Sequence, residues 1–225
     1  MSKLSIIIPV LNEEHFLARH SEAYLSLIRS GHQILVVDGG SQDASIRVAS
    51  ELGCEIFSTK ASRGYQMHFG AKRSRHDMLL FLHADTLLPP HATQMITRIL
   101  TNPAHPWGRF SVRFSDPRLI FRIIAWLMNR RSSLTGIVTG DHAMFVQRAF
   151  YFKCGGYLDI PIMEDVEFSR RLKKHAPPAC LSDAVITSSR KWEQHGIFRM
   201  MLTMWKLRLM YFLGVAPEKI VKLYQ

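Results

Sequence analysis

Hydrophobic runs and helical segments alternate along the first hundred residues. Short, almost continuous apolar runs, typical of strands buried on both faces of a parallel sheet, occupy Leu4–Val10, Gln33–Val37, Glu55–Ser58 and Met78–Leu82. The segments between them predict helices that open at Asn12–Glu14 and cover Ala44–Leu52 and Tyr65–Ser74. This alternation predicts an α/β fold with a mostly parallel central sheet, right-handed crossovers and flanking helices.

The second half of the chain is less regular. Further strands are predicted at Gly108–Phe114, His142–Val146 and Ala184–Thr187, an apolar segment at Leu119–Met128, and helices at Glu164–Lys174 and Ile197–Leu213. Glu164–Lys174 begins with acids and ends with bases, which complements a helix dipole.

The last predicted helix, Ile197–Leu213, is amphipathic, because it mixes apolar residues with Arg199, Lys206 and Arg208. A membrane-spanning helix needs roughly 20 apolar residues with few charges, so none is predicted. A basic and apolar helix either packs on its domain or lies at a bilayer surface. We therefore predict one domain over residues 1–196 and a C-terminal helical extension over 197–225 in one of these two positions.

The amino-acid composition limits the classes of partner that the protein can bind. The 225 residues are 47% hydrophobic, and 29 Lys and Arg against 18 Asp and Glu give a net charge of +11. This charge fits nucleic acid, an anionic membrane or phosphorylated small molecules. No nucleic-acid-binding motif accompanies it, so we expect no nucleic-acid partner. The three cysteines show no paired spacing, and no leader precedes the first strand, so we expect a cytoplasmic protein without disulfides.

A carboxylate ends the fourth predicted strand. Asp85 follows Met78–Leu82, and ligand sites of open α/β sheets lie at the carboxyl ends of strands. Magnesium is often held by one or two carboxylates together with substrate phosphates. His83, two residues earlier, would face the same way and could touch metal, ribose or phosphate. An ordinary polar strand end explains His83 and Asp85 equally well.

A second acid stands at the end of the second strand. Asp38 precedes a glycine turn, where a carboxylate can bind a nucleobase or ribose or simply cap the turn. The dinucleotide fingerprint and the P-loop are both absent from the sequence. Most dehydrogenases and P-loop enzymes are thereby excluded.

Two later segments carry candidate chemistry. Glu164 and Asp165 either compensate a helix dipole or supply a general base for an acceptor hydroxyl. Arg190 or Lys191 could neutralise a diphosphate leaving group, Trp192 could stack on a sugar, and His195 could bind metal or phosphate. A basic loop before a helix is the alternative.

The order of these segments resembles a known family. The chain contains, in this order, SIIIPVLNEE, VVDGGSQDAS, RGYQMHFGA, FLHADT, GDHAMFV, MEDVEF and RKWEQHG. From Lys3 to Gly214 it resembles family 2 glycosyltransferases of the GT-A fold, most closely a short, single-domain bacterial subgroup. The resemblance implies a nucleotide-diphosphate-sugar donor, transfer with inversion, and a divalent metal, Mn²⁺ or Mg²⁺.

The resemblance also implies residue roles. On the donor side it implies a nucleotide pocket formed by Pro9, Asn12, Glu14, Asp38, Arg63 and Gln66, with His83 and Asp85 at the DxD-like motif. On the acceptor side it implies Asp165 as the catalytic base, with Glu164, Arg190 and Trp192 near the acceptor and diphosphate. Asp85, with His195, is the predicted metal ligand. His83 departs from the family pattern, which has an acid there.

Two other functions stay open. A sugar-nucleotide-binding protein would keep Asp38 and Asp85 without needing Asp165. A nucleotidyltransferase would carry a glycine- and arginine-rich loop after the first strand, where this chain has Leu11–Glu14. The apolar and basic segments Leu119–Arg131 and Ile197–Leu213 are compatible with a lipid-linked acceptor and peripheral membrane contact.

Overall fold

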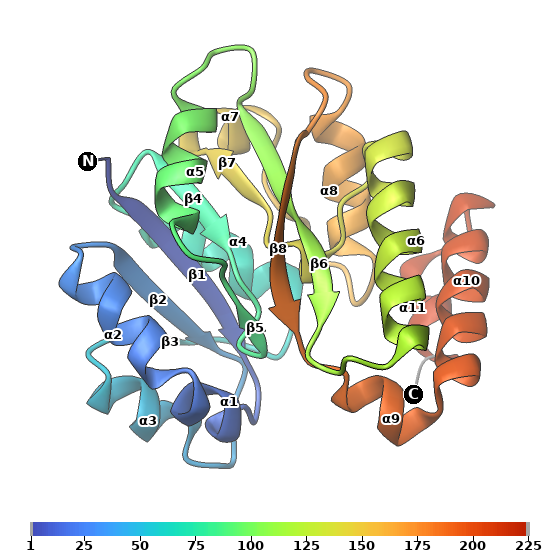
Figure 1. Cartoon of the computed structure of the whole chain (residues 1–225), viewed down its shortest axis with the longest axis horizontal. Helices are drawn as coiled ribbons and strands as arrows, with labels where there is room; N and C mark the ends of the chain where they lie inside the picture. Colours follow the sequence, from blue (N-terminus) through green and yellow to red (C-terminus); the bar gives the residue numbers. More distant parts are fainter. Residues whose placement is uncertain (1, 224–225) are drawn as a thin grey trace.

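Residues 2–223, the part that the computed structural model describes, fold around one sheet; the side chain of Lys191 lies outside the described part. The strand order is β3-β2-β1-β4-β7-β6-β8-β5 (Figure 1). The strands are β1 (Leu4–Val10), β2 (Gln33–Asp38), β3 (Glu55–Ser58), β4 (Met78–Phe81), β5 (Thr86–Leu87), β6 (Trp107–Phe114), β7 (Phe145–Gln147) and β8 (Ala179–Thr187).

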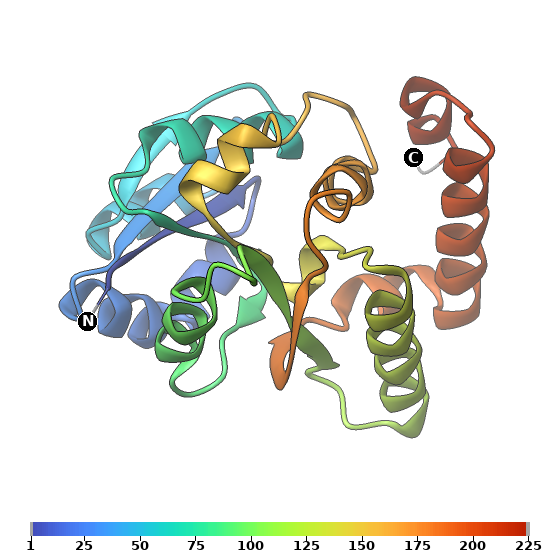
Figure 2. The same cartoon turned by 90° about the horizontal axis from the view of Figure 1, so that it is seen from above.

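Helices cover both faces of this sheet (Figure 2). They are α1 (Glu14–Arg19), α2 (Ser21–Arg29), α3 (Ser45–Glu51), α4 (Arg63–Arg73), α5 (Ala92–Leu100), α6 (Leu119–Thr135), α7 (Arg148–Lys153), α8 (Glu164–Leu172), α9 (Arg190–His195), α10 (Ile197–Phe212) and α11 (Pro217–Val221). A 3-10 turn, Gly140–His142, lies between α6 and β7.

The core consists of two apolar layers, one on each face of the sheet. Ile6 packs in the same layer as Tyr24 of α2, whereas Ile7 packs in the other layer with Met67 of α4. Successive side chains of a strand point to opposite faces, so a strand covered on both sides is apolar throughout. The prediction of a doubly covered sheet is confirmed.

The first four strands all run parallel. Strand β1 pairs with β2 and β4, and β2 pairs with β3. Helix α4 approaches β1 so closely that a Cβ on Gly70 would lie 2.6 Å from the Ile7 side chain. The carboxyl ends of β1, β2 and β4 therefore meet at one edge of the sheet, and the loops after them carry the candidate donor residues.

The second half departs from the predicted pattern. The predicted strand His142–Val146 is wrong, because Gly140–His142 forms a 3-10 turn and Ala143 has a left-handed φ of 47°. The strand there is β7, antiparallel to β4 and β6. Strand β8 begins before the predicted Ala184, and β5 and α7 were not predicted.

The C-terminal helices lie beside α8 and α6 (Figures 1 and 2). Leu207 of α10 and Ile220 of α11 are buried in a small apolar cluster with Ile162 and Met163, which precede α8. Within residues 2–223, none of the helices has both the length and the apolar character that crossing a bilayer requires.

Candidate active site

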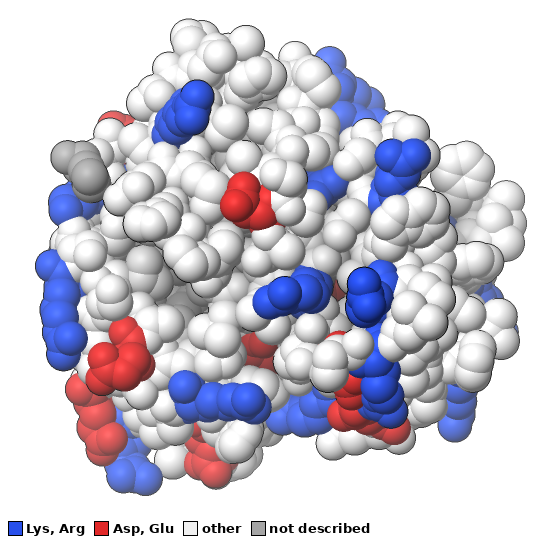
Figure 3. All heavy atoms as spheres, in the orientation of Figure 1, with Lys and Arg blue, Asp and Glu red and all other residues white. Residues whose placement is uncertain are grey.

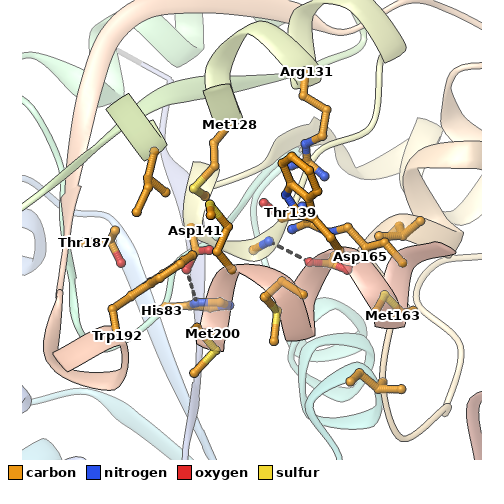
Figure 4. Close-up of a pocket in the computed structure, with 18 of the residues that line it drawn as sticks. His83, Met128, Arg131, Thr139, Asp141, Met163, Asp165, Thr187, Trp192 and Met200 are labelled. Atoms are coloured by element: carbon orange, nitrogen blue, oxygen red, sulfur yellow. Dashed lines mark hydrogen bonds and ion pairs between the residues drawn. The ribbon is translucent and has the colours of Figure 1, made fainter. Parts of the chain in front are cut away.

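A cavity of about 420 Å³ lies at the carboxyl end of β4, between the sheet, α6 and α10. His83, Asp85, Asp141 and Asp165 all line it. Facing them is an apolar wall from α6 and α10, formed by Ile124, Leu127, Met128, Met200, Met201, Met204 and Trp205. Figure 4 shows the acidic and apolar side chains pointing into one space.

His83 and Asp141 meet in this cavity although they are far apart in the sequence. His83 Nδ1 lies 3.8 Å from Asp141 Oδ1 (Figure 4). The imidazole lies against Gly140, where an added Cβ would be 2.3 Å from His83 Nε2. Only glycine fits at position 140 while the histidine keeps this position.

Asp85 is half-buried in the turn between β4 and β5. The hydroxyl of Thr86 donates a hydrogen bond to Asp85 Oδ1 at 3.2 Å. Among the described residues, no group of three or more His, Cys, Asp and Glu side chains is arranged to hold a metal. Asp85 and Asp141 line the same cavity, and carboxylate oxygens together with substrate phosphate oxygens are ligands that hard cations accept.

Asp165 is held by backbone donors at the start of α8. Its Oδ2 accepts a hydrogen bond from Gly140 N at 2.9 Å, and its Oδ1 accepts one from Val166 N at 2.7 Å (Figure 4). These bonds fix the carboxylate at the cavity edge. It is placed to take a proton from a hydroxyl bound in the cavity.

Glu164 faces Arg63 instead of the cavity. Its side chain is only 2% exposed, and its Oε1 lies 2.5 Å from Arg63 Nε. Burial raises the pKa of Glu164, and the positive charge of Arg63 opposes that shift. Glu164 also raises the pKa of Arg63. Arg63 therefore stays cationic at the cavity, positioned by a buried acid.

The loops after β1 and β2 are bonded to each other. Asn12 Oδ1 accepts a hydrogen bond from Gln42 N at 2.8 Å. Glu14 Oε2 accepts one from Ala44 N at 2.7 Å. Pro9 lies in β1 just before this loop. Asn12 and Glu14 thus fix the shape of the loops around the predicted nucleotide pocket.

Asp38 and Gln66 are buried in the same region. Asp38 accepts hydrogen bonds from the backbone N–H groups of Gly40, at 2.8 Å, and Ser41, at 3.1 Å. Gln66 Nε2 donates to the carbonyl oxygens of Val10 and Val37 at 3.0 and 2.7 Å. Both side chains hold the ends of β1 and β2.

The C-terminal candidates separate in space. Trp192 lines the cavity and contacts Phe114 edge-on, with 5.6 Å between ring centroids. Arg190 lies toward α1, where its guanidinium is 4.7 Å from the Phe16 ring centroid. His195 is exposed at the end of α9, outside the cavity lining. Trp192 thus joins the cavity residues, while Arg190 and His195 do not.

Comparison with known proteins identifies the family. Residues 5–157, more than half of the chain, match the family model described as glycosyl transferase family 2. The chain belongs to glycosyl transferase family 2. The predicted family is therefore confirmed.

The curated relatives of this family member are longer proteins. An undecaprenyl-phosphate 4-deoxy-4-formamido-L-arabinose transferase of Pseudomonas paraeruginosa is 35% identical over 98 residues, which cover 39% of this chain and 29% of that protein. The chain spans less than half the length of the first curated relatives that it matches.

Two solved structures share the fold. S. aureus TarS 1-349 superposes with a TM-score of 0.65 at 15% identity, over 83% of this chain and 60% of that one. The mannosyltransferase PcManGT from Pyrobaculum calidifontis, in complex with GDP-Man and Mn²⁺, gives 0.63 at 14% identity, over 82% and 56%. The predicted GT-A fold is confirmed.

Three charged cavity residues among those that the structure describes were not predicted as site residues from the sequence: Asp141, Arg131 and Arg208. Asp141 lies inside the GDHAMFV segment, so its neighbourhood was recognised without its role. Arg131 and Arg208 come from the apolar helices α6 and α10 and stand in no motif. A local pattern does not show which face of a helix will meet a cavity.

Charge is spread over the surface of the protein. On the face in Figure 3, Lys and Arg side chains are scattered among acidic and uncharged ones and form no single basic patch. The cavity itself brings together the three arginines Arg63, Arg131 and Arg208 and the three acids Asp85, Asp141 and Asp165.

Proposed function

We propose that this protein transfers a sugar from a nucleotide-diphosphate-sugar donor to an acceptor hydroxyl, with inversion and with a divalent cation, Mn²⁺ or Mg²⁺. The supporting observation is that Asp85 and Asp141, suited to a cation, share one cavity with the backbone-held Asp165. Family membership supports the reaction. The Mn²⁺ and GDP-Man in the related PcManGT structure support the metal and the donor class.

The donor is proposed to lie along the loops after β1, β2 and β4. Asp85 and Asp141 would hold the cation, which offsets the negative charge of the departing diphosphate. Arg63 adds positive charge inside the cavity, and Arg190 adds it on the α1 side. The hydrogen-bonded loop pair around Asn12 keeps this region preformed, so little reorganisation is needed when the donor binds.

Asp165 is the proposed general base. The acceptor oxygen attacks the anomeric carbon on the face opposite the diphosphate, and Asp165 takes its proton. The new carbon–oxygen bond forms as the bond to the diphosphate breaks, so the nucleoside diphosphate leaves and the configuration inverts. Trp192 is proposed to cover the sugar within the cavity.

A donor panel tests this function. The protein is incubated with nucleotide sugars and Mn²⁺ or Mg²⁺, and nucleoside diphosphate release is measured. Release from at least one donor, dependent on Asp165, is expected. Tight donor binding with no release would favour the sugar-nucleotide-binding alternative. Formation of a nucleoside triphosphate and a sugar phosphate when pyrophosphate is added would favour a nucleotidyltransferase.

The acceptor is proposed to be lipid-linked, with the protein peripheral at the cytoplasmic face of a membrane. The undecaprenyl-phosphate relatives and the apolar cavity wall support this acceptor. Exposed apolar side chains on α6 and α10, including Trp126 (58% exposed) and Phe212 (80%), form an outer apolar face that supports membrane contact.

Sedimentation with anionic liposomes tests the membrane contact. The protein should pellet at low salt, and replacing both Trp126 and Phe212 with serine should leave most of it in the supernatant. Unchanged pelleting of the double variant would count against the outer apolar face.

A further inference from the structure

Arg131 is a half-buried arginine that lines the cavity from α6. Its Nε and Nη2 atoms are buried and have no hydrogen-bond partner among the described residues. Burial, followed by the positive charge of Arg208, lowers the pKa of Arg131 to about 10, and the negative charges of Asp165 and Asp141 oppose that shift. Leaving guanidinium donors buried and unsatisfied is costly, so such a site is completed by a bound anion.

Arg208 lines the same cavity from α10. Burial lowers its pKa, while Asp165 and Asp141 oppose that shift. Neither Arg131 nor Arg208 forms a salt bridge with another described residue. Two arginines from two helices therefore converge on one space, and their repulsion would be relieved by a multiply charged anion.

The surroundings of Arg131 hold no compensating acid at hydrogen-bond distance. Arg109 is buried beside α6 and donates only to neutral oxygens there, including Asn129 O at 3.1 Å and the Ser133 hydroxyl. Burial and the charges of Arg109 and Arg131 lower the pKa of His142 well below its usual range, so that ring stays neutral. Asp141 and Asp165 also act on Arg131 and Arg208, so they offset the three arginine charges near this corner only in part.

The other residues that α6 and α10 contribute to the cavity are apolar. Met128 faces Met200 across the space between α6 and α10 (Figure 4). Methionine side chains adapt to irregular apolar ligands. A purely inorganic anion would use the arginines and leave this wall uncovered, whereas a purely apolar ligand would leave the arginines unsatisfied.

We propose that Arg131 and Arg208 bind the phosphate of an acceptor whose apolar chain lies against the α6–α10 wall, so that a P–O–H group of this phosphate is the acceptor hydroxyl. This assignment rests on the proposed glycosyl transfer and names the acceptor class for the same cavity. Arginine binds phosphate through paired N–H donors, and two arginines can share its oxygens. The bound phosphate lies in the same cavity as Asp165 and Asp85.

Calorimetric titration without any donor tests the site. Three probes are compared: geranyl phosphate, geraniol and inorganic phosphate. Geranyl phosphate should bind at least tenfold more tightly than either of the others. Arg131→Met and Arg208→Met should each weaken geranyl phosphate at least tenfold and leave geraniol binding unchanged, because methionine keeps the apolar stem.

Matched controls come from the same helices. Arg122→Met on α6 and Arg199→Met on α10 change exposed arginines outside the cavity and should leave binding unchanged. Arg131→Lys keeps the charge without the planar fork and should restore part of the lost affinity. Thermal melting of each variant establishes that it is folded before it is titrated.

Three results would overturn the assignment. They are equal binding of geraniol and geranyl phosphate, unchanged binding by folded Arg131→Met and Arg208→Met, and inorganic phosphate binding as tightly as geranyl phosphate. The last result would indicate a free-phosphate site. Failure of the proposed function is seen separately, because the titrations need no donor and nucleoside diphosphate release is measured without an acceptor lipid.

Discussion

The two sides of the cavity differ in whether their polar side chains find hydrogen-bond partners within the protein. On the donor side, formed by the loops after β1 and β2, polar side chains bond to the protein itself, as Asn12 does with Gln42 N. On the acceptor side, formed by α6 and α10, Arg131 presents buried donors with no partner among the described residues. The first side is complete without substrate, and the second is not.

This difference suits two separate tasks in the proposed reaction, which are positioning the donor and selecting the acceptor. A satisfied network holds its loops rigidly, which suits a donor that needs fixed positioning. Unsatisfied cations beside an apolar wall select for a ligand that supplies the missing anion. We therefore expect donor-side changes to act on stability or chemistry, and acceptor-side changes to act on acceptor binding.

The largest effect is expected at Asp165, where the two sides meet. Asp165→Asn should lower sugar transfer at least about a hundredfold, because the amide cannot accept the acceptor proton. Donor binding should be unchanged, because the amide has the size of the carboxylate and its oxygen can still accept one of the two backbone bonds from Gly140 and Val166. Initial rates and donor affinity are measured on the same preparation.

A charge-matched control accompanies this variant. Asp183→Asn removes an exposed carboxylate on β8 and should keep the full transfer rate. Full transfer by Asp165→Asn with normal donor binding would end the general-base assignment.

Removal of the divalent cation is expected to have the next largest effect. EDTA should lower nucleoside diphosphate release at least about tenfold, and Mn²⁺ or Mg²⁺ should restore it. Asp85→Asn should reduce release similarly and raise the metal concentration needed. Asp77→Asn, at the other end of β4 and exposed, is the control. Release that is insensitive to EDTA would remove the metal from the proposal.

The same contrast explains what the sequence could predict. The strands at Leu4–Val10 and Gln33–Asp38 could be predicted because each is apolar on both faces. Asp38 and Asp85 could be proposed as site residues because acids at the carboxyl ends of strands lie where ligands bind. These are local signals. They predicted the parallel half of the sheet, which is confirmed, and the donor-side residues on it, whose roles stay predictions.

The sequence predicted the apolar and basic segments of the acceptor side but not how they meet, because that arrangement arises from packing between distant segments. The short β7 and the 3-10 turn before it depend on the left-handed Ala143 and on contacts with β4 and β6. In the sequence, nothing distinguishes Arg131 from other cations in apolar helices, because its burial depends on the packing of α10. Even Glu164, next to Asp165, pairs with Arg63 from another helix.

Stability measurements sharpen the contrast further. Gln66→Leu removes two buried hydrogen bonds to Val10 O and Val37 O and should lower the free energy of unfolding by about 1–3 kcal/mol. Arg131→Met should leave that free energy unchanged or raise it, because an unsatisfied buried charge is lost. Denaturant unfolding measures both, with the exposed Gln94→Leu as control. Similar losses for Gln66→Leu and Arg131→Met would contradict the contrast.

The smallest effect is expected from the pH dependence of the acceptor side. His142 is fully buried, and burial holds its pKa well below the usual value of 6.5, whereas in the unfolded chain it gains a proton near that pH. The unfolded state thus binds more protons below about pH 6.5, so stability is present above this pH and falls as the pH decreases. One such proton contributes a slope of up to about 1.4 kcal/mol per pH unit.

His142→Gln should flatten this dependence while keeping a polar group near the Thr139 hydroxyl, which lies 3.1 Å from His142 Nδ1. Thermal melting at pH 7.5 and pH 5.5 measures it, and the difference between the two midpoints should shrink in the variant. Burial also lowers the pKa of His20 and His68, so part of the difference should persist. The exposed His175→Gln should keep the whole difference. An equal difference in His142→Gln and the unmodified protein would mean that burial and the charges of Arg109 and Arg131 do not hold this histidine neutral.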